Sequence, residues 1–311
     1  MTIEDPTDER RARAVRATDD DRQPGPLAVS VVTIVSGRRG HLEALGRGVA
    51  RSAHRAHELV VVAIDEDSDP LPEAGEVRVR MLGIASAGGP IPLAAARNLA
   101  IESAESEYVL LLDVDCIPSA GLIGAVAATL DAEDAVAMAP VGYLPRGFAG
   151  PVSSELDDAA LERHARYLRT RPRHPKRGEA CDPRGLWSLA FAGRRSTLLE
   201  RIGGFDPAYA GYGGEDTDLG MRAHRAGVPL VWSGPDPAYH QHHRTLSPPA
   251  QHLEPILRNA RLFHQRWGFW PMEGWLAAFE DRGWIEWKPD GDRVRLLRLP
   301  TAGELSELEV D

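Results

Sequence analysis

Short apolar runs rich in β-branched residues alternate with segments of helical periodicity, and this alternation most limits the folds open to the chain. The apolar runs cover residues 27–35, 59–64, 77–82 and 108–112, and the helical segments cover residues 41–57 and 93–101. Such runs are typical of strands that are covered on both faces. Strands that alternate with helices pair in parallel through right-handed crossovers. We therefore expect an α/β fold, with a mainly parallel sheet flanked by helices.

The rest of the sequence extends this pattern and divides the chain into three parts. Helical patterns recur at residues 121–130, 156–168, 215–225 and 250–267, and strand patterns at residues 135–141, 187–192 and 229–232. We expect a disordered tail at residues 1–25, an α/β domain at residues 26–245 with halves 26–118 and 119–245, and a C-terminal extension at residues 246–311. Residues 143–186 are rich in Pro, Gly and Arg, which is typical of a lid, a substrate loop or a disordered insertion.

The C-terminal extension is rich in tryptophan. Five of the seven tryptophans of the chain fall within 21 residues, at Trp267, Trp270, Trp275, Trp284 and Trp287. One interpretation is a helical subdomain that packs these large side chains on the sheet. The other is a platform on which a bound substrate stacks.

Composition excludes several classes of protein. The net charge is −10 and the sequence has no basic stripe, so we expect no nucleic-acid partner. Cys116 and Cys181 are the only cysteines, and their spacing fits neither a metal motif nor a disulfide framework, which favours a reducing compartment. No apolar run approaches the roughly 18 residues of a membrane span, and no signal-peptide core is visible. We expect a soluble cytoplasmic protein.

A glycine-rich stretch leads directly into an acidic helix start. Five glycines lie between Gly203 and Gly214, and Glu215, Asp216 and Asp218 follow in the first turn of a predicted helix. Glycines let a second molecule approach the main chain closely. Acids at a helix start are also explained by the macrodipole alone, which leaves a purely structural role open.

A second acidic pair follows the fourth apolar run. Asp113 and Asp115 lie at i and i+2 beyond residues 108–112, and open α/β sheets bind ligands beyond the carboxyl ends of their strands. Few protein oxygens around a hard divalent cation leave coordination positions free for phosphate oxygens. A simple turn at the strand end is the alternative.

Histidines downstream extend the possible ligand set. His240, His242 and His243 lie within four residues, and one imidazole would complete a site for Mn²⁺, which accepts mixed oxygen and nitrogen ligands better than Mg²⁺ does. We rank His240 first as ligand and His243 second. Zinc is disfavoured because no cysteine pair accompanies them.

The order of these motifs resembles that of family 2 glycosyltransferases of the GT-A fold. The resemblance covers residues 27–245 and rests on the first strand, Asp65 at the second strand end, Arg97-Asn98, the Asp113-Val114-Asp115 motif, Gly203-Gly204-Phe205-Asp206 and Gly213-Gly214-Glu215-Asp216. The second half is similar to the galactosyltransferase-type branch, in which G-G-F-D is followed by W-G-G-E-D. The resemblance implies a Rossmann-like mixed sheet, a nucleotide-binding half at 26–118 and an acceptor half at 119–245.

The resemblance also implies an inverting transfer of a sugar from a nucleotide-diphosphate sugar to an acceptor hydroxyl, with Mn²⁺ or Mg²⁺ as cofactor. UDP is the preferred nucleotide by family frequency. The residues implied on the donor side are Asp65, Asp67, Arg97, Asn98, Asp113, Val114 and Asp115. Of these, Asp65 or Asp67 would contact the nucleobase, Asp113 the ribose and metal, and Asp115 the metal and diphosphate.

On the acceptor side the resemblance implies roles for Trp187, Tyr212, Gly213 and Gly214. Asp216 would deprotonate the acceptor hydroxyl and Glu215 would hold the acceptor. The helix N-terminus is expected to keep Asp216 ionised. Tyr212 stands where the family often has Trp, so the acceptor, whether glycan, lipid, metabolite or peptide, stays open, as does the oligomeric state, for which a homodimer is one option.

Two other functions fit part of the pattern. D-x-D after a buried strand also occurs in haloacid-dehalogenase-like phosphohydrolases, with Asp216 and Asp218 as distal ligands. In that fold the motif follows the first strand, whereas here it follows the fourth, and Lys176 lies in the irregular insertion. A noncatalytic nucleotide-sugar-binding protein is the second alternative, which the intact carboxylate set argues against.

Overall fold

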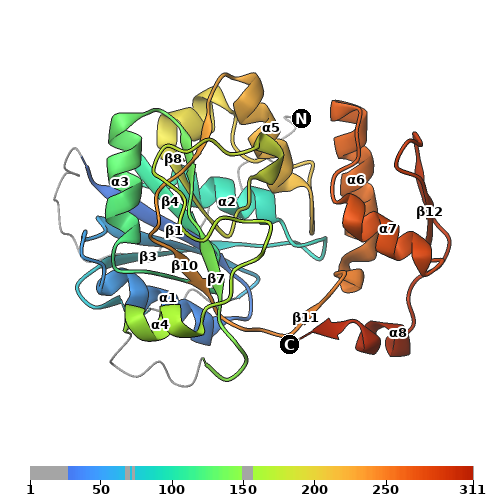
Figure 1. Ribbon diagram of the computed structural model, residues 1–311, viewed down its shortest axis with the longest axis horizontal. Helices are drawn as coiled ribbons and strands as arrows, with labels where there is room; N and C mark the ends of the chain where they lie inside the picture. Colours follow the sequence, from blue (N-terminus) through green and yellow to red (C-terminus); the bar gives the residue numbers. More distant parts are fainter. Residues whose placement is uncertain (1–26, 67–70, 72–73, 149–156, 311) are drawn as a thin grey trace, which may run out of the picture.

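A mixed sheet of seven strands forms the centre of the protein (Figure 1). The computed structural model describes residues 27–66, 71, 74–148 and 157–310. The strand order is β3-β2-β1-β4-β8-β6-β9. The strands are β1 (Val29–Val35), β2 (Glu58–Ile64), β3 (Arg78–Ile84), β4 (Tyr108–Leu112), β6 (Val136–Met138), β8 (Ala190–Arg194) and β9 (Leu230–Trp232). Only β8 runs against its neighbours, since it is antiparallel to β4 and to β6 while the other pairs are parallel. The predicted mainly parallel α/β sheet is confirmed.

Helices cover both faces of the sheet. One face carries α1 (Arg39–Ala50) and α3 (Leu122–Ala132), and the other carries α2 (Leu93–Glu102), a π-helical turn (Thr197–Arg201) and α5 (Glu215–Arg225).

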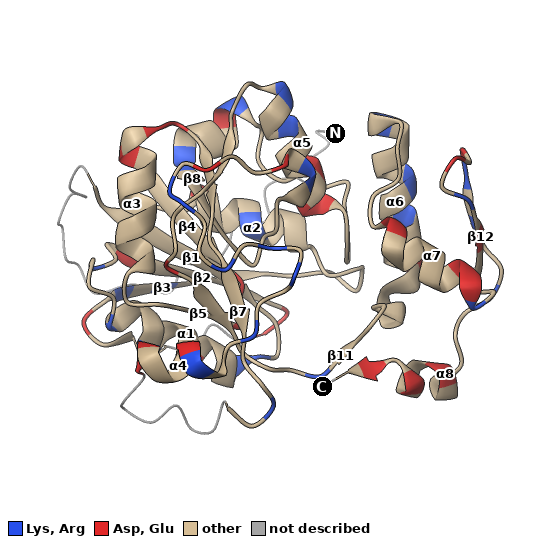
Figure 2. Cartoon of the chain, viewed as in Figure 1, with Lys and Arg blue, Asp and Glu red and all other residues tan. Residues whose placement is uncertain are grey.

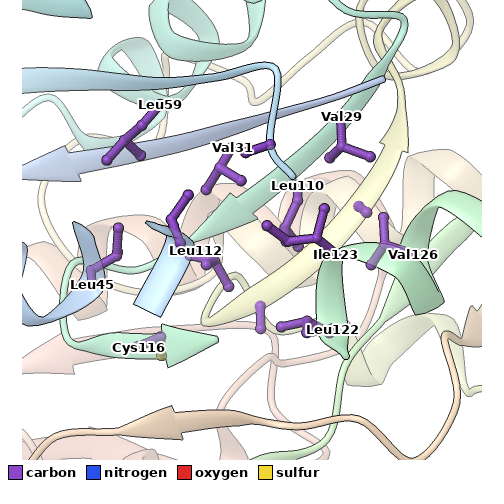
Figure 3. Packing of buried hydrophobic residues seen from close by; sticks show 14 of the residues in the cluster. Val29, Val31, Leu45, Leu59, Leu110, Leu112, Cys116, Leu122, Ile123 and Val126 are labelled. Atoms are coloured by element: carbon purple, nitrogen blue, oxygen red, sulfur yellow. The ribbon is translucent and has the colours of Figure 1, made fainter. Parts of the chain in front are cut away.

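Strand residues alternate between the two cores. Val29 and Val31 pack with α1 and α3, as Figure 3 shows, whereas Val32 and Ile34 pack with α2 and α5. All seven residues of β1 are buried. Since successive side chains of a strand point to opposite faces, a continuous apolar run is what a sheet between two helical layers requires.

A second, three-stranded sheet lies beside the first and was not predicted. Its order is β5 (Cys116–Pro118), β10 (Ala238–His240) and β7 (Val141–Tyr143). The single strand predicted at residues 135–141 is therefore wrong: the chain leaves the large sheet after β6 and enters the small one at β7. Pro140 lies at the break, where it has no N–H to donate to a ladder and its carbonyl accepts from the N–H of Ala238 at 2.9 Å. The helix α4 (Asp158–His164) packs on this small sheet through Leu161.

The C-terminal segment has a hydrophobic core of its own. Its elements are the 3₁₀ turn Ala250–His252, α6 (Leu253–Trp267), α7 (Glu273–Asp281), the hairpin of β12 (Ile285–Trp287) and β13 (Val294–Leu296), and α8 (Ala302–Glu307). Trp270, Trp284 and Trp287 are buried in that core. Trp275 packs against the same core, and both Trp267 and Trp275 also make contacts with the α/β part, described below. Strand β11 (Thr245–Leu246) pairs with β14 (Glu309–Val310), so the two ends of the segment meet.

Charged residues of both signs lie mainly on helices such as α4, α5 and α6 and on loops, whereas β1 and β4 carry none (Figure 2). Among the described residues, no helix is both long and apolar enough to cross a membrane. The tail predicted at residues 1–25 lies outside the described residues, as do Asp67 and residues 149–156 of the predicted insertion.

Candidate active site

The D-x-D motif forms a tight turn beyond the end of β4. The N–H of Asp113 donates to the carbonyl of Leu189 at 2.9 Å, and the N–H of Cys116 donates back to the carbonyl of Asp113 at 2.9 Å. The chain then enters β5. Asp115 is only 2 % exposed, so the turn directs its carboxylate into the protein. The intervening Val114 side chain packs in the core, which leaves only its backbone for a ligand.

The small sheet brings two histidines to Asp115. In the β5–β10 pairing His240 lies opposite Cys116, and the N–H of Gln241 donates to the carbonyl of Asp115 at 2.7 Å. The Nε2 atoms of His240 and His243 lie 3.4 and 3.2 Å from the Asp115 carboxylate oxygens. The three side chains offer ligand atoms that all lie within 4.8 Å of one another.

These groups have protonation properties suited to a cation. Burial opposes ionisation of Asp115, but its hydrogen bond with His243 and the charges of His240 and Arg38 lower its pKa to about 2. Burial lowers the pKa of His240, which favours the neutral imidazole. Metal ligands must be deprotonated carboxylates and neutral imidazoles. Asp115 and His240 meet this requirement, whereas the hydrogen bond with Asp115 raises the pKa of His243, so a bound cation would have to displace the proton of His243.

Arg38 and Tyr143 border this cluster, and neither was predicted. Arg38 forms an ion pair with Asp115, and its side chain is 39 % exposed, so it reaches the carboxylate from the solvent side. The ring of Tyr143 lies 5.0 Å from that of His240. Arg38 follows the end of β1, at the same sheet edge as Asp113. Because ligands of α/β sheets bind beyond the carboxyl ends of the strands, this position could have been predicted to border the site.

Buried Arg97 links the D-x-D turn to the acidic helix start. It is 4 % exposed, its Nη1 donates to Glu215 at 2.9 Å and its Nη2 lies 3.8 Å from Asp113. Burial alone would lower the pKa of Arg97, but the two carboxylates raise it overall. Burial in turn raises the pKa of Asp113 to about 6, against the opposing charge of Arg97. Asp113 is not one of the three residues whose ligand atoms converge within the described part of the chain.

The helix α5 begins at the predicted acids. Gly214 precedes it with φ 89°, a left-handed conformation that favours glycine. Glu215 is 5 % exposed, and the N–H of Thr217 donates to Asp216 at 2.8 Å. Burial and the charge of Glu215 raise the pKa of Asp216 to about 6. Burial and the charge of Glu215 thus outweigh the backbone hydrogen bonds from Thr217 and Ser188, which lower the pKa, but a pKa of about 6 still leaves Asp216 mostly ionised at neutral pH.

The third acid of this helix has a structural role. Asp218 is fully buried, and its Oδ1 accepts from the Nη1 of Arg266 at 2.8 Å and from the indole N–H of Trp267 at 2.9 Å. Its Oδ2 accepts from Arg222 at 2.7 Å. Both oxygens are thus occupied, which leaves Asp218 unsuited as the metal ligand that the phosphohydrolase alternative requires.

Two predicted donor-side residues are engaged with backbone. The amide of Asn98 donates to the carbonyl of Phe205 and accepts from its N–H, both at 2.7 Å. Asn98 therefore fixes the G-G-F-D turn, and a Cβ on Gly204 would come within 2.7 Å of its Oδ1. Asp65 lies at the end of β2 with φ 56° and accepts from the N–H of Ser86 at 2.8 Å.

The predicted acceptor residues lie in two aromatic groups. Trp187 lines a pocket together with Tyr143 and Arg171, whose guanidinium lies 4.9 Å over the indole ring. Tyr212 is 37 % exposed and stacks on the rings of His252 and Trp275. The last two residues belong to the C-terminal segment. His252 was not predicted, whereas Trp275 is one of the tryptophans of the substrate platform that the sequence left open.

Comparison with known families agrees with this arrangement. Residues 92–191 match the model described as glycosyl transferase family 2, and residues 190–244 match the model described as N-terminal domain of galactosyltransferase. The two matches meet at β8 and together contain Arg97, the D-x-D turn and the start of α5. The chain is therefore similar to family 2 glycosyltransferases over residues 92–191 and to galactosyltransferases over residues 190–244. No curated protein matches its sequence.

Solved structures share the GT-A fold of this chain, which confirms the predicted fold class. TarS from S. aureus is 16 % identical with a TM-score of 0.51, over 83 % of this chain and 43 % of that one. GalNAc-T7 with UDP, GalNAc and Mn²⁺ is 16 % identical with a TM-score of 0.50, over 70 % of this chain and 43 % of that one. The chain also covers 64 % of a shorter TarS chain, residues 1–349. It thus spans less than two thirds of each of these proteins.

Proposed function

We propose that this glycosyltransferase moves a sugar from a nucleotide-diphosphate sugar, UDP-linked, to an acceptor hydroxyl with inversion at the anomeric carbon, and that Asp216 is the general base. The observation that carries the proposal is that Arg97 links two clusters of acidic residues, through its contacts with Glu215 and Asp113. On one side lies Asp216 with a pKa of about 6, and on the other lies the D-x-D turn with the Asp115, His240 and His243 cluster.

The base fits the chemistry required of it. In the proposed step the acceptor oxygen forms a bond to the anomeric carbon while its proton passes to Asp216, and the bond from that carbon to the diphosphate breaks with its electron pair leaving on the diphosphate. A carboxylate with a pKa of about 6 is mostly ionised at neutral pH and is a stronger base than an ordinary aspartate. General-base assistance of this kind contributes about 10²–10⁴-fold.

Glu215 and Arg97 support the base. Glu215 is buried with one carboxylate oxygen on Arg97, and its Oε2 has no hydrogen-bond partner in the described structure. A buried acceptor atom left unpaired is costly, so a hydroxyl of the acceptor substrate is a suitable partner for it. This supports the proposed role of Glu215 in holding the acceptor, next to Trp187, Tyr212, Gly213 and Gly214.

The donor side needs a place for the diphosphate. Asp115, His240 and His243 would hold Mn²⁺ or a similar divalent cation, which when bound would offset the negative charge of the leaving diphosphate. We propose that Asp113 contacts the ribose and that Asp65 or Asp67 contacts the nucleobase, with Arg97, Asn98 and the backbone of Val114 nearby. The UDP and Mn²⁺ in the GalNAc-T7 structure make this nucleotide and this metal the first to test.

The test is a panel of UDP-sugars with simple glycosides as acceptors, in Mn²⁺, in Mg²⁺ and in EDTA, with UDP release as the readout. Asp216→Asn should lower the rate of transfer about 10²–10⁴-fold and leave the Kd of the donor within about twofold. Asp292→Asn is the matched control, because Asp292 is an exposed acid in the β12–β13 turn.

Loss of donor binding in Asp216→Asn would contradict the role of Asp216 as base. Donor binding without transfer or hydrolysis over the whole panel would favour the noncatalytic alternative. Release of phosphate from simple monoesters would favour a phosphohydrolase.

A further inference from the structure

We propose that the C-terminal segment is part of the active site: Asn259 positions the loop formed by residues 210–214, here called the acceptor loop, and His252 and Trp275 fix Tyr212 in it. This inference rests on the proposed function, since it assigns the choice and placement of the acceptor to this segment. The acceptor loop leads directly into Glu215 and Asp216. Any displacement of the loop therefore moves the proposed base.

The acceptor loop cannot hold its own shape. Gly211, Gly213 and Gly214 adopt φ values of 74°, 97° and 89°, and glycine loses more conformational freedom on ordering than any other residue. The segment has no regular secondary structure. Its conformation must therefore come from neighbouring elements.

Asn259 of α6 supplies the main fixation. Its side chain is fully buried, and its Nδ2 lies 2.8 Å from the carbonyl oxygen of Gly213, 3.3 Å from that of Tyr212 and 3.4 Å from that of Ala210. The two N–H donors of this amide thus lie among three carbonyls of the loop, of which that of Gly213 is the nearest. Buried carbonyls without a donor are costly, so removal of this amide favours other loop conformations.

Close packing from the same segment surrounds the loop. A Cβ on Gly213 would lie 2.8 Å from the sulfur of Met272, and a Cβ on Gly211 would lie 2.9 Å from Pro255. In Figure 1 the loop before α5 extends toward α6, which is consistent with these contacts. The backbone of the loop therefore lies directly against the C-terminal segment.

Aromatic stacking fixes the one large side chain of the loop. The ring of Tyr212 lies 4.7 Å from that of His252 at an interplanar angle of 22° and 5.9 Å from that of Trp275 at 23°. Burial and the charges of Glu215 and Asp216 raise the pKa of Tyr212, so its hydroxyl stays protonated at neutral pH. The stack thus presents a neutral phenol at a fixed position beside the proposed base.

The same segment also holds the helix that carries the base. Arg266 contacts both Asp206 of the G-G-F-D turn and Asp218 of α5, and Trp267 donates to Asp218. Asp218 is fully buried, so its carboxylate is shielded from solvent. Loop and helix therefore both contact the C-terminal segment, in addition to the α/β domain on which α5 packs.

Asn259→Leu tests the inference in the full-length protein, because leucine has a similar size and no donor. We expect kcat/KM for the acceptor to fall about 10- to 100-fold, as misplacement of a reacting group does, while the Kd of the UDP-sugar and its slow hydrolysis by water stay within about twofold. Trp275→Phe, which keeps a ring, should raise the KM of the acceptor and leave the Kd of the donor unchanged. Trp287→Phe is the matched control, since Trp287 is buried in the core of the same segment.

Hydrogen exchange provides a readout that does not depend on activity. In Asn259→Leu the amides of residues 210–214 should exchange at least about tenfold faster, with β1 unchanged. Unchanged loop exchange, or equal losses of donor binding and transfer, would overturn the inference. Should the wild-type protein transfer no sugar, the proposed function fails, while the exchange measurement still decides whether Asn259 orders the loop.

Discussion

Replacement of Arg97 by methionine is the sharpest test of the site as a single electrostatic unit. Arg97 is 4 % exposed and contacts Glu215 at 2.9 Å and Asp113 at 3.8 Å. Methionine fills much of the same volume but leaves two carboxylates without a cation. Removal of one partner of a buried ion pair costs about 3–5 kcal/mol. At about 2–4 °C per kcal/mol for a domain of this size, Tm should fall by about 6–20 °C.

The loss should depend on pH, with a sign fixed by the pKa values. Burial raises the pKa of Asp113 and of Asp216 to about 6, from an ordinary value of 3.8, and the charge of Arg97 opposes both shifts. A carboxyl group whose pKa is raised by folding stabilises the native state below its unfolded pKa and loses that contribution as pH rises through the folded value. Without Arg97 both values rise further. The difference in Tm between wild type and variant should therefore be small at pH 5 and large at pH 8.

Differential scanning fluorimetry at pH 5, 6, 7 and 8 measures this difference. Arg295→Met is the matched control, because the Arg295–Glu286 ion pair is exposed, with side chains 68 % and 56 % accessible. Such a pair contributes at most about 1 kcal/mol. A loss in Arg97→Met no larger than in the control, or one that is equal at all four pH values, would refute the reasoning.

The remaining predictions concern the base, the histidines and a glycine turn. The rate of transfer at low acceptor concentration should rise with pH and reach half its plateau near pH 6, the pKa to which burial and Glu215 raise Asp216; a midpoint near pH 4 would point to another base. His240→Ala should weaken binding of Mn²⁺ by at least about 10- to 100-fold, because loss of even an outer-shell partner has an effect of this size. Unchanged affinity for Mn²⁺ in titration calorimetry would show that His240 is not a ligand. Gly204→Ala should destabilise the protein to urea more than Gly227→Ala. Both glycines have φ near 65–69°, but only at Gly204 would a Cβ meet a neighbour, the Oδ1 of Asn98 at 2.7 Å. Equal losses of stability in the two variants would mean that the Asn98 side chain can move aside without weakening the fold.

The sequence was informative where local pattern and fold agree. The buried strand runs predicted the sheet, and the rule that ligands bind beyond strand ends predicted a site at Asp113 and Asp115. The structure does bring His240 and His243 to Asp115. The proline at position 140 was a visible signal for the break between β6 and β7, because proline rarely occupies a strand interior, and it was missed.

Features that depend on contacts between distant segments could not be predicted in the same way. The raised pKa of Asp216 comes from burial next to Glu215, which helix periodicity does not reveal. Asn259 left a weak signal, as a polar residue on the otherwise apolar face of α6 that contains Ile256 and Phe263. Its three carbonyl partners, however, lie more than 40 residues away in sequence.

The pairing of β11 with β14 has a consequence for protein engineering. Because Thr245 lies opposite Val310, the C-terminal segment leaves and rejoins the same point, a few residues beyond His243. A segment closed in this way joins the α/β domain by the chain near β11, and it also contacts the acceptor loop, the G-G-F-D turn and α5. Grafts of this segment from related enzymes that retain the counterparts of Asn259, Arg266 and Trp267 would preserve the contacts that position the acceptor loop and α5. The surface around Tyr212 could then be varied separately. Acceptor preference would then change without alteration of the strands that carry the donor side.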